Sequence, residues 1–300
     1  TAHFLNEVRK AQSLGIEPVS VEYQFQDVMA RVQRVIQTIA PHDSIERYTQ
    51  LGVEVIQGKA HITSPWTVSV NDQILSTRTI VIATGARSAI PDLPGLDQVR
   101  YYTSETIWSL QQPPKHLIVL GGGPVGCELA QAFARLAIPV TLVARNRLLM
   151  REDHEVAALI ESALQADGVK ILTQCKATRC EVIGSEQRLF LCDQAGIETM
   201  LVFDALLCAV GREARVTGYG LEELGINLLP TGTIETNDKL QTIYPNIYAC
   251  GDVVGPYQFT HIAAHQAWYA AANGLFDMIK RFRVDYRVIP WSIFTDPEVA

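Results

Sequence analysis

Apolar residues near the start of the chain recur at the three- and four-residue spacing of an amphipathic helix. The positions that carry this spacing are Phe25, Val28, Met29, Val32, Val35, Ile36 and Ile39. We therefore expect helical structure over residues 1–51. Asp43 or Ser44 is suited to cap a second helix that ends near Gly52.

From residue 53 the hydrophobic period changes to two, which predicts short strands. These strands are expected at residues 53–56, 67–70 and 74–76, with a turn at Asn71 and Asp72 between the last two. Residues 79–83 form a continuous apolar run, which is typical of a strand that is buried on both faces.

Residues 116–172 alternate between short apolar runs and helical periodicity. The expected elements are strands at 117–120, 140–144 and 169–172 and helices at 125–136 and 154–167. Such alternation predicts right-handed βαβ units and a parallel sheet.

The second half of the chain predicts further strands and one long helix. The expected elements are an antiparallel meander at 178–203, a buried strand at 205–210, a strand within 240–249, a helix at 259–281 and the start of a new strand unit after 287. Buried strands that end at Gly85 and Gly211 suggest two related nucleotide-binding folds.

Composition narrows the class of protein. The length of 300 residues corresponds to about two domains of ~150 residues, and 48% apolar residues exclude a disordered chain. A net charge of −7 without basic runs argues against nucleic-acid binding. No apolar run reaches the roughly 18 residues of a membrane span. Six scattered cysteines do not form a disulfide scaffold, so we expect a reducing, cytoplasmic location.

One motif indicates dinucleotide chemistry. Residues 121–126 read Gly-Gly-Gly-Pro-Val-Gly between an apolar strand and an amphipathic helix, the context in which G-x-G-x-x-G binds a dinucleotide. Gly121 permits the tight turn, Gly123 lets the backbone approach a pyrophosphate, and Gly126 lets the helix pack against the sheet. The amides of the helix N-terminus, with Gly122 and Val125 in the same loop, are then available to the phosphates.

The residues after the next strand predict which nucleotide binds. Arg145 and Arg147 follow the strand at 140–144, and no acidic residue lies between Ile138 and Met150. NAD sites place a carboxylate there for the ribose 2′-hydroxyl, whereas guanidinium groups suit the 2′-phosphate of NADP. We therefore expect NADP(H), with NAD as the less favoured alternative.

The chain resembles the class I pyridine nucleotide–disulfide oxidoreductases at four segments in the right order. These are the strand that ends in Thr84 and Gly85, the loop 121–126 with Glu128, the strand that ends in Gly211 and Arg212, and residues 242–252, which end in Gly251 and Asp252. Within the family, residues 130–136 and 144–153 are most similar to mercuric reductases.

The resemblance implies an α/β protein with two Rossmann-like domains, in three layers with antiparallel meanders. An FAD domain (1–112 and 237–286) would be interrupted by an NAD(P) domain (113–236), and 287–300 would begin a dimerisation domain. Hydride would pass from nicotinamide to flavin and on to a disulfide or metal-ion acceptor, as in mercuric reductase and dihydrolipoamide dehydrogenase. The full-length enzyme would be a homodimer.

The resemblance also implies roles for single residues. Glu128 would lie near the nicotinamide, Asp252 would bond the flavin ribityl chain, and Thr260 and His261 would lie beside the isoalloxazine. The implied cofactor contacts also include Ala83, Thr84, Gly85, Gly211, Arg212 and Gly251.

Several of the family's features are not found in these 300 residues: the first glycine motif, the redox dithiol with its lysine, and the C-terminal His-x-x-x-x-Glu base. We therefore expect a piece of a longer chain that is inactive alone. Cys175 and Cys180 have the redox spacing but lie after a strand of the NAD(P) domain, so we interpret them as a chance pair. No metal site is expected. The alternative function is a non-catalytic NADP(H)-binding module or a redox sensor.

Overall fold

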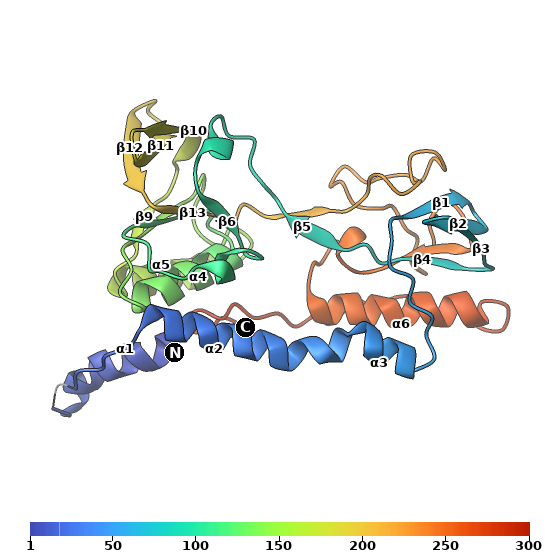
Figure 1. Cartoon of the computed structure of the whole chain (residues 1–300), viewed down its shortest axis with the longest axis horizontal. Helices are drawn as coiled ribbons and strands as arrows, with labels where there is room; N and C mark the ends of the chain where they lie inside the picture. The colour runs from blue at the N-terminus through green and yellow to red at the C-terminus, as the bar shows by residue number, and fades with distance from the viewer. Residues whose placement is uncertain (18) are drawn as a thin grey trace. The chain divides into compact units, whose positions relative to one another are not determined.

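A computed structural model describes residues 1–17 and 19–300 (Figure 1). Residue 18, inside the predicted helical stretch, lies outside them. The chain forms two compact units: unit 1 comprises residues 1–42, 88–211 and 292–300, and unit 2 comprises residues 43–87 and 212–291. Each unit combines helices with parallel strands, which confirms the predicted α/β class.

Unit 1 is built on a five-stranded sheet in which every neighbouring pair is parallel. Its strands, in spatial order, are β6 (Tyr101–Thr103), β13 (Ala205–Cys208), β7 (Leu117–Leu120), β8 (Val140–Val143) and β9 (Lys170–Leu172). The three inner strands are buried at every position, as expected for parallel strands covered on both faces.

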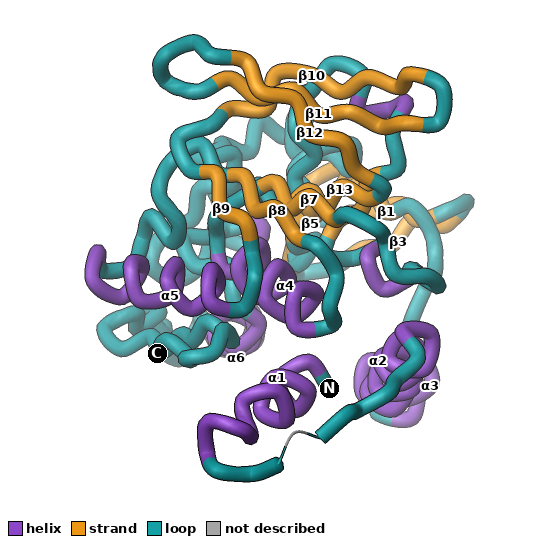
Figure 2. The backbone as a smooth tube through the Cα atoms, turned by 90° about the vertical axis from the view of Figure 1, so that its left-hand side faces the viewer, coloured by secondary structure: helices purple, strands orange, loops and turns teal. Residues whose placement is uncertain are grey.

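Two different layers cover this sheet (Figure 2). The helices α4 (Pro124–Arg135) and α5 (His154–Ala166) pack on one face, where Leu117 and Val119 join their core. On the other face lies the antiparallel meander of β10 (Lys176–Ile183), β11 (Glu186–Cys192) and β12 (Glu198–Phe203), whose core includes Ile118 and Leu120. The predicted meander and βαβ units are thereby confirmed.

The N-terminal helices complete unit 1. Helix α1 (Ala2–Lys10) packs against α4, and the short η1 (Ala11–Leu14) follows it. Helix α2 (Phe25–Ile39) contributes Phe25 and Met29 to the helical core. The remaining short turns are η2 (Ala40–Asp43), η3 (Leu96–Gln98) and η4 (Ile107–Ser109).

Unit 2 centres on a parallel pair of strands, β4 (Ile80–Ile82) and β15 (Ile247–Ala249), against which α6 (Thr260–Phe276) packs. Its other elements are α3 (Ile45–Gln50), β1 (Ala60–Ser64), β2 (Thr67–Val70), β3 (Gln73–Ser76), β5 (Ala86–Ser88), β14 (Arg212–Ala214) and η5 (Gly251–Val253). Strands β1 to β3 form an antiparallel sheet, and β5 pairs with β14. The Ser44 hydroxyl caps α3 by accepting from the Arg47 amide at 3.2 Å, one of the two predicted caps.

Several predicted elements differ in the structure. Residues 53–56 are not a strand, because among the described residues no neighbouring strand supplies their hydrogen bonds. Strand β4 is not buried on both faces, since Val81 is 43% exposed. Helix α6 ends at Phe276 rather than near 281, and after residue 287 the chain makes only an isolated bridge between Ile293 and Val299.

The compact units also divide the chain at other places than the predicted domains. Residues 1–42 and 88–112 belong to the unit of β7 to β9 rather than to that of β4, and residues 212–236 belong with β4 and β15. The reason is core packing, which the motif order does not report: Phe25 and Ile107, for example, share the core of α4 and α5. Which cofactor each unit binds stays a prediction.

None of the helices within residues 1–17 and 19–300 is both long enough and apolar enough to cross a membrane.

Gly126 is a position in unit 1 at which a side chain would collide with the backbone. A Cβ there would lie 2.0 Å from the carbonyl oxygen of Gly121. Alanine would add up to about 1 kcal/mol of helix propensity, but the backbone collision costs roughly 1–3 kcal/mol or more. We therefore expect Gly126→Ala to lower the free energy of unfolding, measured by urea denaturation.

Gly123→Ala is the matched control, because a Cβ there meets nothing within 4 Å and φ is −82°. It should cost no more than about 1 kcal/mol, the loss of a favourable N-cap residue. Equal unfolding free energies for the two variants would contradict the close-packing argument.

Candidate functional site

The glycine loop joins β7 to α4 through two close backbone approaches. Gly121 has φ of +128°, and a Cβ there would lie 2.2 Å from the Ala209 carbonyl oxygen on the neighbouring chain segment. Gly126 sits on the Gly121 carbonyl in the same way. The roles that the motif predicts for these two glycines, a tight turn and close helix packing, match this geometry.

The N-terminus of α4 is open to a ligand. Gly123 is its N-cap, no side chain caps it, and Pro124 at the first position has no amide hydrogen to satisfy. Val125 is 40% exposed, and the space beside Gly123 is free. Uncapped amides at the positive end of a helix are the donor set that a pyrophosphate needs, so the loop fits a dinucleotide.

Arg145 and Arg147 lie directly after β8, but their surroundings differ. The Arg145 side chain is exposed. The Arg147 guanidinium donates to four backbone carbonyl oxygens of its own loop: those of Leu148, Leu149, Met150 and Glu152, at 2.9–3.2 Å. The 2′-phosphate contact of Arg147 stays a prediction, but the structure uses four of its five N–H groups to shape the loop.

Glu128 lies on the first turns of α4 and is half-buried. Its Oε1 accepts a hydrogen bond from the Phe294 amide at 2.9 Å, which ties it to the segment 292–300 of the same unit. Burial raises the pKa of the Glu128 carboxyl group, and the Phe294 amide partly offsets this effect.

In unit 2 the residues after β4 are held by a loop that is distant in sequence. The Thr84 hydroxyl donates to the Arg215 carbonyl at 2.9 Å and lies 3.1 Å from the Tyr219 hydroxyl. The Gly85 carbonyl accepts from the Arg215 amide at 2.9 Å. Ala83 and Thr84 remain exposed, so their backbone is accessible to a ligand at the carboxyl end of β4.

Asp252 lies at the carboxyl end of the adjacent strand β15. Its Oδ2 forms an ion pair with Arg212 Nε at 3.3 Å, and the same guanidinium donates to the Ala86 carbonyl. The amide of the preceding Gly251 donates to the buried Gln266 side chain at 2.6 Å. Oδ1 of Asp252 has no partner among the described residues, so it is available to a hydroxyl group such as those of a ribityl chain.

The structure gathers most of the predicted unit 2 residues but not all of them. Ala83, Thr84, Gly85, Arg212, Gly251 and Asp252 lie at the neighbouring ends of β4 and β15. Thr260 and His261 open α6 and are exposed, and among the described residues no hydrogen bond or ion pair joins them to that group. The His261 ring stacks on Phe259 at 5.4 Å and lines a cavity of about 140 Å³ with Ile262 and Pro290.

Cys175 and Cys180, which have the redox spacing, are poorly placed for thiolate chemistry. Cys180 lies in β10, where burial raises its pKa to about 11, and Cys175 lies in the preceding loop with a pKa that burial also raises. Burial raises the pKa values of Cys127 and Cys208 to about 12. The latter two, with Cys250, are buried as predicted from their apolar neighbours.

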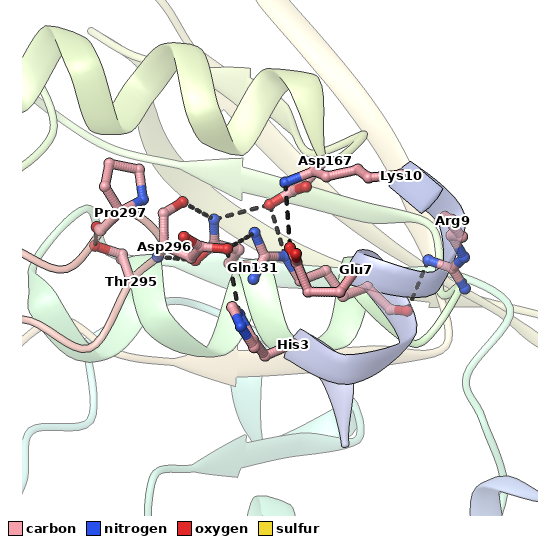
Figure 3. A network of polar contacts seen from close by, with 10 residues as sticks. His3, Glu7, Arg9, Lys10, Gln131, Asp167, Thr295, Asp296 and Pro297 are labelled. Atoms are coloured by element: carbon pink, nitrogen blue, oxygen red, sulfur yellow. Dashed lines mark hydrogen bonds and ion pairs between the residues drawn. The ribbon is translucent and has the colours of Figure 1, made fainter. Parts of the chain in front are cut away.

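One side-chain cluster within residues 1–17 and 19–300 has metal-like spacing: His3, Glu7 and Asp296, with ligand atoms within 4.8 Å of one another. Asp296 Oδ2 is already 2.7 Å from Arg135, and Lys10 lies 3.9 Å from Glu7 (Figure 3). Because two cations already neutralise these carboxylates, the cluster is better described as an ion-pair network.

The sequence reasoning missed the polar side of α4. Gln131 and Arg135 were not singled out, although with Glu128 they share one helical face at the positions i, i+3 and i+7. Three polar residues on one face of a helix that is otherwise mostly apolar were the available signal. Arg215, Tyr219 and Gln266 were missed as well, because their partners are distant in sequence.

Comparisons with known proteins show which family the chain belongs to. The family model for pyridine nucleotide-disulphide oxidoreductases matches residues 10–267. A mercuric reductase from Staphylococcus aureus is 34% identical over 86% of this chain and 46% of its own length. A dihydrolipoyl dehydrogenase from Bacillus subtilis is 30% identical over 100% of this chain and 65% of its own length.

A solved structure shows the same fold. The HOCl-induced flavoprotein disulfide reductase RclA from Escherichia coli superimposes with a TM-score of 0.82 at 27% identity, over 99% of this chain and 65% of that one. The chain thus spans about half the length of the mercuric reductases it matches and about two thirds of the other relatives.

The family is FAD-dependent and binds NAD(P), which is the chemistry that the glycine loop and the ends of β4 and β15 fit separately. The predicted resemblance is therefore confirmed, and the chain belongs to the pyridine nucleotide-disulphide oxidoreductase family.

Proposed function

We propose that this chain is part of an FAD-dependent NADPH oxidoreductase that reduces a disulfide or a metal ion. The observation that carries the proposal is the uncapped N-terminus of α4 behind the Gly121–Gly126 contact. Family membership supports the flavin, and the relatives support the acceptor class. Those relatives are named mercuric reductase, dihydrolipoyl dehydrogenase and flavoprotein disulfide reductase.

The residues of unit 1 would bind and orient the nicotinamide nucleotide. The Val125 and Gly126 amides would bind the pyrophosphate, and Arg145 would bind the 2′-phosphate. Glu128 would lie at the nicotinamide end, where its carboxylate is already oriented by the Phe294 amide. Arg147 would support the site by holding residues 148–152 in place.

The residues of unit 2 would bind the flavin. Asp252 would accept a hydrogen bond from the ribityl chain while Arg212 balances its charge, and Ala83, Thr84 and Gly85 would line the same site. Bound nicotinamide and flavin would together supply the hydride transfer. That the whole protein is a cytoplasmic homodimer is a further proposal. The resemblance supports the homodimer, and the scattered cysteines support the location.

The nucleotide preference can be tested at Arg145. Loss of a charge-assisted hydrogen bond costs about 1.5–3 kcal/mol, so Arg145→Ala should weaken NADPH binding at least about tenfold and change NADH binding little. Dissociation constants from isothermal titration calorimetry measure both. Arg100→Ala is the control, because Arg100 is exposed and precedes β6 at the opposite, amino-terminal edge of the sheet. Equal affinity of the wild type for NADH and NADPH would refute the preference.

The flavin role of Asp252 gives a second test. Asp252→Asn keeps the size of the side chain but removes the charge that strengthens a bond to a hydroxyl group, so FAD should bind several-fold more weakly. Quenching of flavin fluorescence on titration measures the affinity. Asp238→Asn is the control, since Asp238 is half-exposed and pairs with Arg283 in the same unit. Unchanged FAD affinity in Asp252→Asn would remove Asp252 from the flavin site.

Thiol reactivity tests the interpretation of Cys175 and Cys180 as a chance pair. A pKa of about 11 leaves Cys180 almost wholly protonated at pH 8, because the thiolate fraction falls tenfold for each unit by which the pKa exceeds the pH. Iodoacetamide should therefore modify the half-exposed Cys192 faster than Cys180, as read by peptide mass spectrometry. Rapid modification of Cys180 in the folded chain would show an accessible thiolate and reopen a redox role.

A further inference from the structure

One face of α4 binds a single short stretch of chain. Glu128, Gln131 and Arg135 lie at i, i+3 and i+7 of the helix, and all three bond residues 294–296 of the same unit. Phe294 N donates to Glu128 Oε1 at 2.9 Å, and Asp296 N donates to Gln131 Oε1 at 2.8 Å. Gln131 Nε2 donates to the Asp296 carbonyl at 2.8 Å, and Arg135 donates to its carboxylate at 2.7 Å (Figure 3).

The two residues behind Glu128 are fixed. Gln131 is 3% exposed and Arg135 is 4% exposed, and each also donates to Asp167 Oδ2 at 2.8 Å. Gln131 thus bonds both the amide and the carbonyl of Asp296, and its bond to Asp167 fixes its own side-chain rotamer. A buried polar side chain whose bonds are all made has one favoured orientation, so this contact sets where Asp296 lies.

The segment 293–299 is closed by a backbone bridge between its two ends. Ile293 is 1% exposed within the helical core, and it bridges Val299 through two backbone bonds at 2.7 and 3.1 Å. Phe294 therefore lies between an anchored Ile293 and an Asp296 held by Gln131. Its side chain is 73% exposed, so the backbone contacts rather than the ring determine its place.

The orientation of the Glu128 carboxylate depends on the position of the Phe294 amide. The Phe294 amide is its one hydrogen-bond partner among the described residues, and a half-buried carboxylate with a single donor points wherever the donor lies. Moving residues 294–296 would release the Glu128 carboxylate while leaving the glycine loop at the start of α4 in place.

We propose that Gln131 is a positioning residue for the nicotinamide end of the dinucleotide site, acting through residues 294–296 to orient Glu128. The inference rests on the proposed function, since it requires a nicotinamide nucleotide on α4. It assigns the two ends of the ligand to different structures: the phosphates to the helix N-terminus, and the nicotinamide to the face that 294–296 completes.

The test compares the whole nucleotide with its adenine half. Gln131→Met keeps the volume of the side chain and removes its hydrogen bonds. NADPH binding to the chain should weaken about fivefold, whereas binding of 2′-phospho-ADP-ribose, which lacks the nicotinamide, should change less than about twofold. Gln165→Met is the control, because Gln165 is exposed on the neighbouring helix α5.

A double-mutant cycle separates positioning from a merely structural role. Glu128→Ala removes the group on which Gln131 is proposed to act, so adding Gln131→Met to it should weaken NADPH binding no further. If circular dichroism shows that Gln131→Met fails to fold, Asp296→Asn replaces it, since that side chain is 36% exposed and the substitution removes its charge towards Arg135 and His3 while keeping its size.

The outcomes are distinct. Equal weakening of NADPH and 2′-phospho-ADP-ribose, no weakening of either, or additive losses in the cycle would each overturn the positioning role and leave the proposed function standing. A wild-type chain that binds neither ligand would overturn the proposed function and the inference together.

Discussion

The close approach of two backbone segments, Gly126 on Gly121, is the constraint on which unit 1 depends. With 2.0 Å between a hypothetical Cβ and the carbonyl oxygen, only glycine lets α4 begin where it does. The start of the helix fixes its axis, and the axis fixes which residues face the sheet and which face the segment 294–296. The close approach of Gly126 to Gly121 thus places both the uncapped N-terminus of α4 and the polar face that carries Glu128 and Gln131.

Near the end of α4, the buried guanidinium of Arg135 pairs with two carboxylates. Replacing a buried ion pair by apolar residues is often neutral or stabilising, whereas removing one partner is costly. Arg135 is paired with both Asp167 and Asp296. Burial raises the pKa of Asp296, but the Arg135 hydrogen bond and the charges of Arg135, His3 and Lys10 together lower it below its ordinary value. The Asp296 carboxylate is thus held ionised, and the contact selects one position of the segment.

Unit 2 shows how motifs far apart in sequence become one site. Strands β4 and β15 are parallel neighbours, so their carboxyl ends meet at one edge and bring Thr84 and Gly85 beside Gly251 and Asp252. The loop after β14 stabilises the first pair of residues, while Arg212 and Gln266 stabilise the second. Ligands of open α/β sheets bind at this kind of edge, which is why the positions of these strands matter more than their length.

Local pattern alone determined the bounds of several elements of unit 1. Strands β7 and β8 and helices α4 and α5 end within about a residue of their predicted bounds, because continuous apolar runs and helical periodicity are local signals. The glycine loop could be predicted for the same reason, because its glycines meet local backbone constraints: a positive φ at Gly121 and a close backbone contact at Gly126. The burial of Cys127, Cys208 and Cys250 also followed from their apolar neighbours.

Only the tertiary structure decided what depends on partners distant in sequence. The alternation at residues 53–56 resembles a strand, yet no described strand pairs with it, and Val81 is exposed although its neighbours are apolar. The sequence offered Arg147 for a phosphate, but the fold surrounds its guanidinium with four carbonyls. Likewise Glu128 and Gln131 gain their hydrogen-bond partners only when folding brings residues 294–296 to them, some 165 positions along the chain. Hydrogen bonds of this kind join residues that are far apart in sequence, and local periodicity carries no information about such pairs. The sequence therefore identifies the polar groups, whereas the tertiary packing determines which groups they bond.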